Sequence, residues 1–284
     1  MNRVECASSI NTYTFQLSSS VALRIYAGTR PHNWKTAALQ KGLIVVHDGV
    51  EVVGEGMGFG APVVVYSDEA YFSSNSRVHS CEQRGTMVVR KEFDMDTVAR
   101  NSLWNMTLES HKARTLLRNL DELYQRHKRL QSLALKRLST KMSIETNFIK
   151  TGSVGKIAVD YFISKERIRI NAHFGLLNNE KVRKIVMLNE QGSKIFKRYT
   201  DSEGEELVDR DLGAWSIVNA QWACMTDQDG KLGFRLNRID NAVLRVGREF
   251  LEGTLDWAGL DYEVNSKALE FEYNVEMLGS ELLT

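Results

Sequence analysis

Acid–base side chains gather in one stretch of this chain, close to a glycine-rich segment. The candidates for proton transfer are Glu55, Asp68, Tyr71 and His79. A pair of carboxylates, or a histidine or tyrosine facing a carboxylate, can move a proton at a sugar carbon or at a glycosidic oxygen. Because a single polar group such as His79 more often serves the structure, these residue types leave open whether the protein is an enzyme.

The glycine-rich segment, residues 54–62, reads Gly-Glu-Gly-Met-Gly-Phe-Gly-Ala-Pro, with four glycines at alternate positions. A nucleotide-binding glycine loop opens a helix, whereas this segment runs directly into the β-branched stretch 63–66. Alternate glycines on an extended strand remove the side chains from one face, so a ligand, an aromatic ring or another backbone can approach closely. A bulged strand at a sheet corner is the alternative. If a ligand approaches, the candidate binding residues are Gly56, Gly58, Phe59, Tyr66, Arg77 and Trp257.

Tryptophans and carboxylates also occur together near the C-terminal end of the chain. Residues 256–262 read Asp-Trp-Ala-Gly-Leu-Asp-Tyr, and Trp215 and Trp222 lie on predicted strands. Aromatic rings beside polar groups suit a sugar, although core packing explains buried aromatic residues equally well. Together with the glycine segment, this pattern favours a small polar ligand, with a carbohydrate as the preferred class.

The elements that must position these groups are predicted to be strands. Leu43–His47 and Val50–Val53 flank Asp48-Gly49, a dipeptide suited to a type I′ hairpin turn. Further hairpins are predicted around residues 67–69, 83–85, 165–166, 189–193 and 227–230. Short turns join antiparallel strands, and the count is roughly fourteen strands. We therefore expect a mainly β chain that forms one domain over residues 1–284, a large antiparallel β sandwich or barrel.

One segment, about 94–140, breaks the strand pattern. Leucines recur there at three- and four-residue steps, which predicts an inserted α-helical segment, with Asp94 or Asp96 as its N-terminal cap. The segment from Lys112 to Lys141 contains nine basic residues and only two acidic ones. The basic side chains are interpreted as a solvated helix face, a site for an anionic partner, or a contact with a second subunit in a homo-oligomer. No nucleic-acid-binding motif accompanies them.

Composition excludes several classes of protein. With 43% hydrophobic residues and a formal net charge of +1, the chain is expected to be compact, without a general attraction to nucleic acids or membranes. No apolar run approaches the roughly 20 residues of a membrane span. Three separated cysteines and the absence of an N-terminal apolar region favour a cytoplasmic location with reduced thiols. No cofactor motif or metal-spaced histidine cluster occurs, so neither a cofactor nor a metal is expected.

At the level of the strand pattern alone, the chain resembles the large β sandwiches of sugar mutarotases and some polysaccharide lyases, which implies a carbohydrate ligand. The sequence thus predicts binding or processing of a small polar ligand in a cleft bordered by residues 55–71. The rival hypothesis is a non-enzymatic interaction or scaffold protein that uses the basic segment. A lipocalin-like container for an apolar molecule is a third hypothesis.

Overall fold

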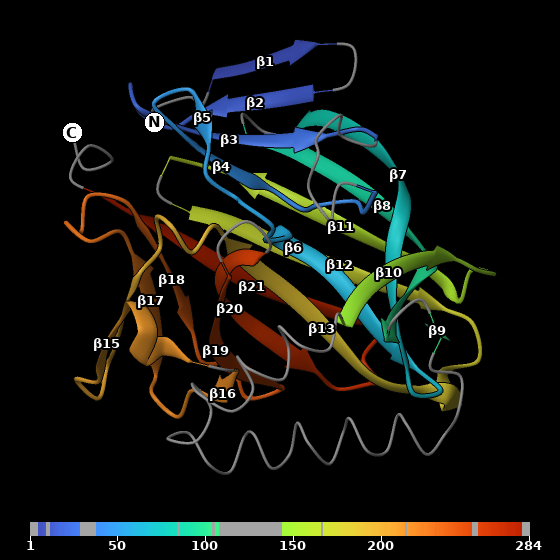
Figure 1. Ribbon diagram of the computed structural model, residues 1–284. Helices are drawn as coiled ribbons and strands as arrows, with labels where there is room; N and C mark the ends of the chain where they lie inside the picture. The colour runs from blue at the N-terminus through green and yellow to red at the C-terminus, as the bar shows by residue number, and fades with distance from the viewer. Residues whose placement is uncertain are drawn as a thin grey trace.

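The computed structural model describes residues 5–9, 12–28, 38–83, 86–103, 106–107, 144–165, 167–213, 215–251 and 255–279. These residues form two antiparallel sheets (Figure 1). The smaller sheet contains β1 (Glu5–Ser9), β2 (Thr12–Gln16), β3 (Val21–Tyr26), β4 (Ile44–His47) and β5 (Val50–Glu51), in that order. Asp48 and Gly49 both have positive φ, so the predicted hairpin between β4 and β5 is confirmed.

The larger sheet has sixteen strands, whose bounds are as follows. They are β6 (Gly58–Tyr66), β7 (Glu69–Gln83), β8 (Thr86–Leu103), β9 (Met106–Thr107), β10 (Ile144–Lys150), β11 (Gly155–Ile163), β12 (Arg167–Leu176), β13 (Val182–Gln191), β14 (Arg198–Asp201), β15 (Glu206–Val208), β16 (Ser216–Ile217), β17 (Trp222–Thr226), β18 (Gly233–Asn237), β19 (Ala242–Leu251), β20 (Leu255–Val264) and β21 (Glu270–Leu278). Two 3-10 turns, η1 (Asn179–Lys181) and η2 (Asp209–Leu212), interrupt them.

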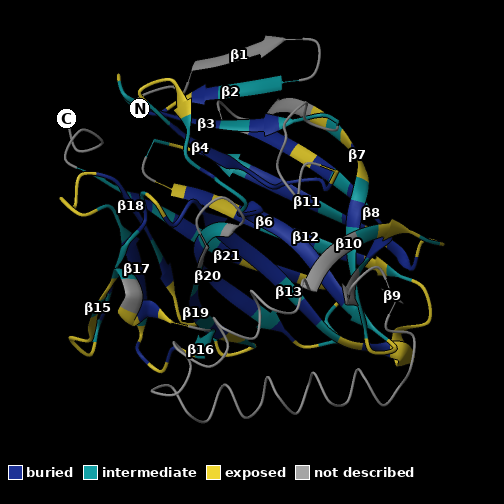
Figure 2. Cartoon of the chain, viewed as in Figure 1, coloured by how far each residue is buried: buried dark blue, intermediate teal, exposed yellow. Residues whose placement is uncertain are grey.

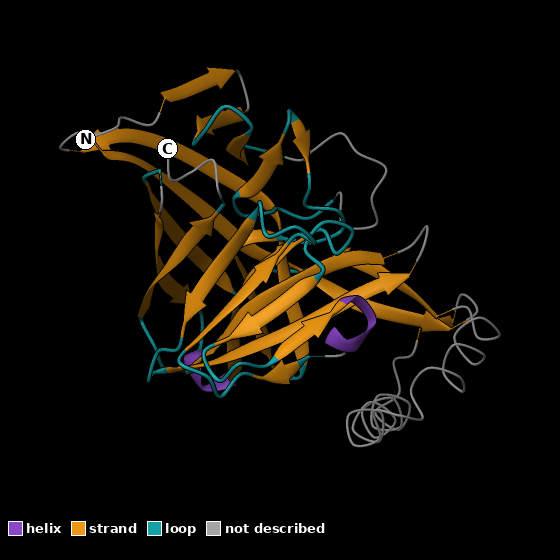
Figure 3. Ribbon diagram, turned by 90° about the vertical axis from the view of Figure 1, so that its left-hand side faces the viewer, coloured by secondary structure: helices purple, strands orange, loops and turns teal. Residues whose placement is uncertain are grey.

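The main path of this sheet runs β15-β14-β17-β18-β21-β12-β11-β8-β7-β6-β13-β20-β19-β16, and β9 and β10 pair with β8. Figure 3 shows the strands curling around the interior. The edge strands β15 and β16 are not paired with each other, although η2 and a short connection join them along the chain. The mainly β class is therefore confirmed, but the predicted sandwich or barrel is wrong because the sheet is large, continuous and not closed.

The core lies on the inner face of the large sheet and extends to the small sheet. Along β21, Phe271, Tyr273 and Val275 are buried and alternate with more exposed polar residues, as the two-residue period of a strand requires. Buried side chains of β2, β3 and β4 belong to the same apolar cluster as those of the large sheet. Figure 2 shows the buried residues concentrated in the strands of both sheets. The shared core holds the sheets together through the hydrophobic effect.

The predicted inserted α-helical segment is a second correction. Asp94–Leu103 belongs to the long strand β8, which pairs with β7, β10 and β11. Pairing with these neighbouring strands outweighs any local helical pattern. The described part of the chain contains no α-helix. The rest of the predicted helix, residues 108–143, lies outside the described residues. No helix among the described residues is long and apolar enough to cross a membrane.

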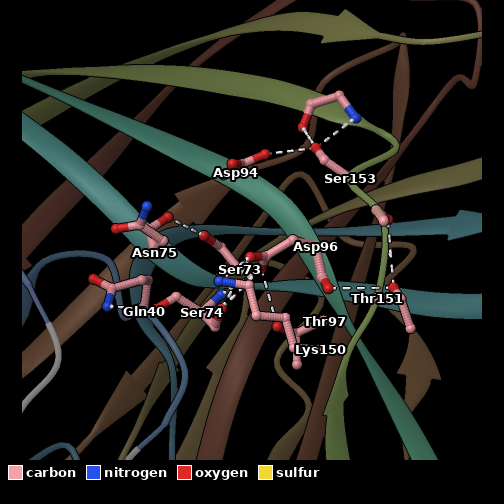
Figure 4. A network of polar contacts seen from close by, with 12 residues as sticks. Gln40, Ser73, Ser74, Asn75, Asp94, Asp96, Thr97, Lys150, Thr151 and Ser153 are labelled. Atoms are coloured by element: carbon pink, nitrogen blue, oxygen red, sulfur yellow. Dashed lines mark hydrogen bonds and ion pairs between the residues drawn. The ribbon is translucent and has the colours of Figure 1, made fainter.

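Asp96, predicted as a helix cap, instead satisfies backbone and side-chain donors at a bulge (Figure 4). The pairing of β7 with β8 shifts register around Ser73. There the Asp96 carboxylate accepts hydrogen bonds from the Ser74 backbone N–H, the Ser74 hydroxyl and the Thr97 hydroxyl, each at 3.0 Å. Burial by itself would raise the pKa of Asp96, but these bonds and the Lys150 ammonium, 3.4 Å away, bring it below its usual value. The carboxylate thus stabilises the bend of β7.

Lys91 connects the two sheets from the inner face of β8. Its side chain is fully buried, and its ammonium donates to the backbone carbonyls of Tyr26, at 2.8 Å, and Lys41, at 2.7 Å. Tyr26 ends β3, and Lys41 precedes β4, so the bonds tie the small sheet to β8. Burial lowers the pKa of Lys91 to about 7, because desolvation disfavours the charged form.

The Lys91→Met variant tests the cost of that buried amine. A lysine whose pKa is lower in the folded than in the unfolded state binds fewer protons when folded, so stability rises with pH between the two values. We expect the free energy of unfolding to rise by about 3 kcal/mol between pH 7 and 9.5 in the parent protein and to stay nearly constant in Lys91→Met. Urea denaturation at both pH values measures it, and an equal rise in both proteins would contradict this role.

Candidate functional site

Two glycines lie in line with Glu190 across the outer face of three neighbouring strands. Glu190 of β13 pairs with Gly259 of β20, and Gly259 pairs with Gly247 of β19. Paired residues in an antiparallel sheet point to the same face. This is the face opposite the main core, because Ala258 and Leu260 of β20 are the residues that enter it. The two glycines therefore leave the space beside the Glu190 side chain without a neighbouring side chain of β19 or β20.

Two tryptophans flank this glycine row. Trp257 is half-buried on β20, two residues from Gly259 and paired with Glu249 of β19. The Trp215 ring lies directly over Gly247, where a Cβ atom would collide with it. Gly247 is therefore required for Trp215 to pack against the sheet. With Lys41, these residues form what we call the acid–tryptophan face, which consists of Lys41, Glu190, Trp215, Glu249, Trp257 and Asp261.

Glu190 and Asp261 are two buried carboxyl groups on this face. The Glu190 carboxylate accepts the Met57 backbone N–H at 3.2 Å, and the Asp261 carboxylate accepts the Asn189 backbone N–H at 2.8 Å. Burial raises the pKa of Glu190 to about 7; the Met57 hydrogen bond and Lys41 oppose this shift, whereas Glu249 adds to it. Burial and the neighbouring Glu190 raise the pKa of Asp261. Both shifts favour the protonated carboxyl up to a higher pH than usual, which is the direction that general acid–base chemistry at neutral pH requires.

Lys41 brings a positive charge to the same place. Its side chain is buried, and its ammonium donates to the backbone carbonyls of Gly56 and, at 3.3 Å, Gly54. These carbonyls belong to the turn before β6, whose next residue, Met57, donates to Glu190. Lys41 is thus held by the turn that also holds Glu190, and its charge favours the ionised form of that carboxyl.

The side chains on either side of Glu190 lock β13 into its neighbours. The Asn189 carboxamide oxygen accepts from the Gly60 N–H at 3.2 Å and from the Tyr273 hydroxyl at 2.9 Å, while its NH2 donates to the Leu260 carbonyl at 3.1 Å. Gln191 donates to the Leu43 carbonyl at 3.3 Å. Because both side chains point inward, they fix the strand register that points Glu190 outward.

The polar run from Asn189 to Ser193 was predicted as a turn, and this prediction is wrong up to Gln191. β13 continues through Asn189, Glu190 and Gln191, all of them buried. Gly60 is the extra residue of a bulge opposite Leu188 and Asn189. The bulge breaks the ladder, and the polar side chains replace the lost backbone bonds. Sequence patterns missed these residues because a run of amide and acid side chains is also typical of exposed turns.

The glycine-rich segment serves close backbone packing in this fold. Gly58 and Gly60 have positive φ, and a Cβ atom at Gly58 would lie 2.7 Å from the Leu43 carbonyl oxygen. At Gly60 it would lie 3.0 Å from the Tyr161 hydroxyl. Of the interpretations open at the sequence level, approach of another backbone describes Gly58, approach of an aromatic ring describes Gly60, and a bulged strand describes the register shift at Gly60.

The predicted site residues are spread over several separate parts of the fold. Glu55 and Gly56 lie in the turn before β6, beside β20, because the Glu55 N–H donates to the Asp256 carbonyl at 2.9 Å. Gly58 and Phe59 are buried in β6, where the Phe59 ring packs edge-on against Phe234. Trp257 lies on the acid–tryptophan face, so the structure brings only Glu55, Gly56 and Trp257 of the predicted residues to its vicinity.

The other predicted residues lie farther along the chain. Tyr66 and Tyr71 form an edge-on ring pair, and exposed Asp68 is in the turn between β6 and β7, 4.0 Å from Arg183. The nine residues of β6 separate this turn from Glu55 by a distance of about 25 to 30 Å. Arg77 and His79 are exposed on β7, paired with Glu92 and Arg90. One small ligand cannot reach all these groups.

Comparisons with known proteins identify distant structural likenesses only. No protein-family model matches the chain, and no curated protein matches it. Among solved structures, it is similar to ligand-free alpha-N-acetylgalactosaminidase NagBb from Bifidobacterium bifidum, with a TM-score of 0.45 and 9% identity over 93% of this chain and 35% of that chain. It is also similar to the Slr1438 protein of Synechocystis sp. PCC 6803, with a TM-score of 0.38 and 9% identity over 98% of both chains. The chain thus spans about a third of the glycosidase.

The Glu190→Gln variant tests whether the buried carboxyl destabilises the fold. An acid whose pKa is raised by folding holds its proton longer when folded, so its stabilising effect is present below the unfolded value of 4.5 and is lost as pH rises towards 7. Glutamine removes this loss. We expect Glu190→Gln to be more stable than the parent protein by about 2 to 3 kcal/mol at pH 8 and by far less at pH 4.5. Denaturant unfolding at both pH values is the measurement, and a variant destabilised equally at both would show that Glu190 has only a packing role.

Proposed function

We propose that the acid–tryptophan face binds a small polar ligand, and that this ligand is a carbohydrate. The observation that carries the proposal is the buried Glu190–Asp261 carboxyl pair beside half-exposed Trp257 and Glu249. Burying two neighbouring carboxyls weakens a fold, and proteins accept such a cost mainly where function needs the groups. Aromatic rings beside hydrogen-bonding groups suit the apolar face and the hydroxyls of a sugar ring.

Each residue then has a defined task. The Trp257 ring provides the flat apolar surface, and Glu249, its cross-strand partner, accepts hydrogen bonds from ligand hydroxyls. Glu190 supplies an acid group whose pKa of about 7 suits it to either giving or taking a proton at neutral pH. If the ligand is converted, Glu190 is the residue that performs the proton transfer, with Glu249 as the second carboxylate.

The rival proposal is a binding or scaffold protein that uses its basic segment. The excess of nine basic over two acidic residues between Lys112 and Lys141 supports it, because such clusters bind anionic partners through counterion release. That segment lies outside the described residues. A second subunit bound through it, and a cytoplasmic site of action, belong to the same set of proposals.

A ligand that binds only the folded protein raises its melting temperature, so a thermal-shift panel tests the proposal directly. We expect a shift with one class of mono- or oligosaccharide. Trp257→Ala is expected to weaken binding about tenfold by removing the aromatic surface. Glu272→Gln, an exposed acid on β21, is the control and is expected to retain the shift. Titration of tryptophan fluorescence gives the affinities.

Two results would count against the carbohydrate proposal. A shift seen only with polyanions, fading as salt rises and abolished by charge reversal at Arg126, Lys128 and Arg129, would assign the function to the basic segment. An equal loss of sugar binding in Trp257→Ala and Glu272→Gln would place the ligand elsewhere on the molecule.

A further inference from the structure

Two neighbouring carboxyl groups on the acid–tryptophan face are both buried. Glu190 is 7% exposed and Asp261 4% exposed. Glu190 pairs with Gly259, so Asp261, two residues along β20, is its diagonal neighbour on the same face. Two negative charges on diagonally adjacent residues repel each other strongly where the dielectric constant is low, and burial also removes water from both. The pair therefore holds one proton over a wide range of pH and titrates as a unit.

The charges around the pair balance one ionised carboxyl but not two. Those on the same face or next to it are Lys41 before β4, Lys184 of β13, Arg245 and Glu249 of β19 and Glu263 of β20. Lys184 and Arg245 each pair with Glu263 at 3.2 Å. With the pair itself, four acids accompany three bases. This part of the surface is thus negative when all four acids are ionised and neutral with one proton bound.

A carboxyl pair with one proton has a defined hydrogen-bonding character. The protonated group donates one O–H, and the ionised group only accepts. A ligand hydroxyl both donates and accepts, so neighbouring hydroxyls match the pair, whereas a phosphate or carboxylate offers only acceptors and adds a negative charge. The flanking Trp257 and Trp215 rings favour a ligand with an apolar ring face. The chemistry selects against anionic sugars.

We propose that the ligand of this face is an uncharged polyhydroxy ring compound, held by the protonated member of the Glu190–Asp261 pair as donor and by the ionised member as acceptor. This inference rests on the proposed function and specifies its ligand class. It also makes binding depend on pH, because the donor is lost when the pair gives up its shared proton. Burial raises the pKa of Glu190 to about 7 and that of Asp261 above its ordinary value, so the pair loses this proton at a higher pH than carboxyl groups ordinarily do.

The experiment is a calorimetric titration of the full chain with glucose and galactose, their 6-phosphates and their uronates, at pH 6 and pH 8. The neutral sugar that binds is expected to weaken about tenfold from pH 6 to pH 8, since its binding requires one proton. At pH 8, titration in two buffers of different ionisation enthalpy is expected to show proton uptake on binding. The phosphate and uronate of that sugar are expected to bind at least tenfold more weakly than the parent.

Variants separate the roles of the pair. Glu190→Gln keeps an N–H donor but cannot ionise, so its sugar affinity is expected to become independent of pH; Asp261→Asn serves as a second test, with circular dichroism confirming that each variant folds. Glu272→Gln is expected to keep the pH dependence of the parent. Tighter binding of an anionic sugar, or an affinity equal at pH 6 and pH 8 in the parent protein, would overturn this inference and leave the proposed function standing. Failure of every sugar to bind would overturn both.

Discussion

The architecture depends on the close backbone packing of β6 against β13 and against the segment that leads into β4. The bulge at Gly60 interrupts the ladder between β6 and β13, and Asn189 replaces the lost bonds with its carboxamide. The Leu43 carbonyl approaches Gly58 so closely that any side chain there would collide with it. Backbone polar groups buried without partners would be costly, so the bulge persists only because these side chains satisfy it. The small sheet, the main sheet and the outer acids are all positioned by this junction.

Four of the buried charged residues form two pairs that differ in their partners. Lys91 donates to two carbonyls between the sheets, and Asp96 accepts three hydrogen bonds at the β7 bulge, so their environments account for them as structural groups. Glu190 and Asp261 have a backbone donor each but also repel one another. This repulsion opposes folding, whereas the hydrogen bonds of Lys91 and Asp96 support it. For this reason the candidate function is placed at Glu190 and Asp261.

Part of the site prediction was wrong because closeness along the chain did not correspond to closeness in the fold. Glu55 and Asp68 are close in sequence, yet the length of β6 lies between them, whereas Glu190 and Trp257 are far apart in sequence and lie diagonally on adjacent strands. Trp257 was identified because aromatic and acidic residues occur together around it. Glu190 was missed because its neighbours, Asn189 and Gln191, look like turn residues, and only burial reveals their role.

The sequence by itself determined the mainly β class and most hairpins, because two-residue periodicity and the Asp48-Gly49 turn act locally. It also identified the unusual glycine segment without deciding what approaches it. Only the tertiary structure decided that backbone rather than ligand fills the space beside Gly58, that Asp94–Leu103 extends a strand, and that the sheet stays open. These outcomes depend on pairing between distant segments, and the free energy of such pairing is set by register and burial, which no local pattern of residues encodes.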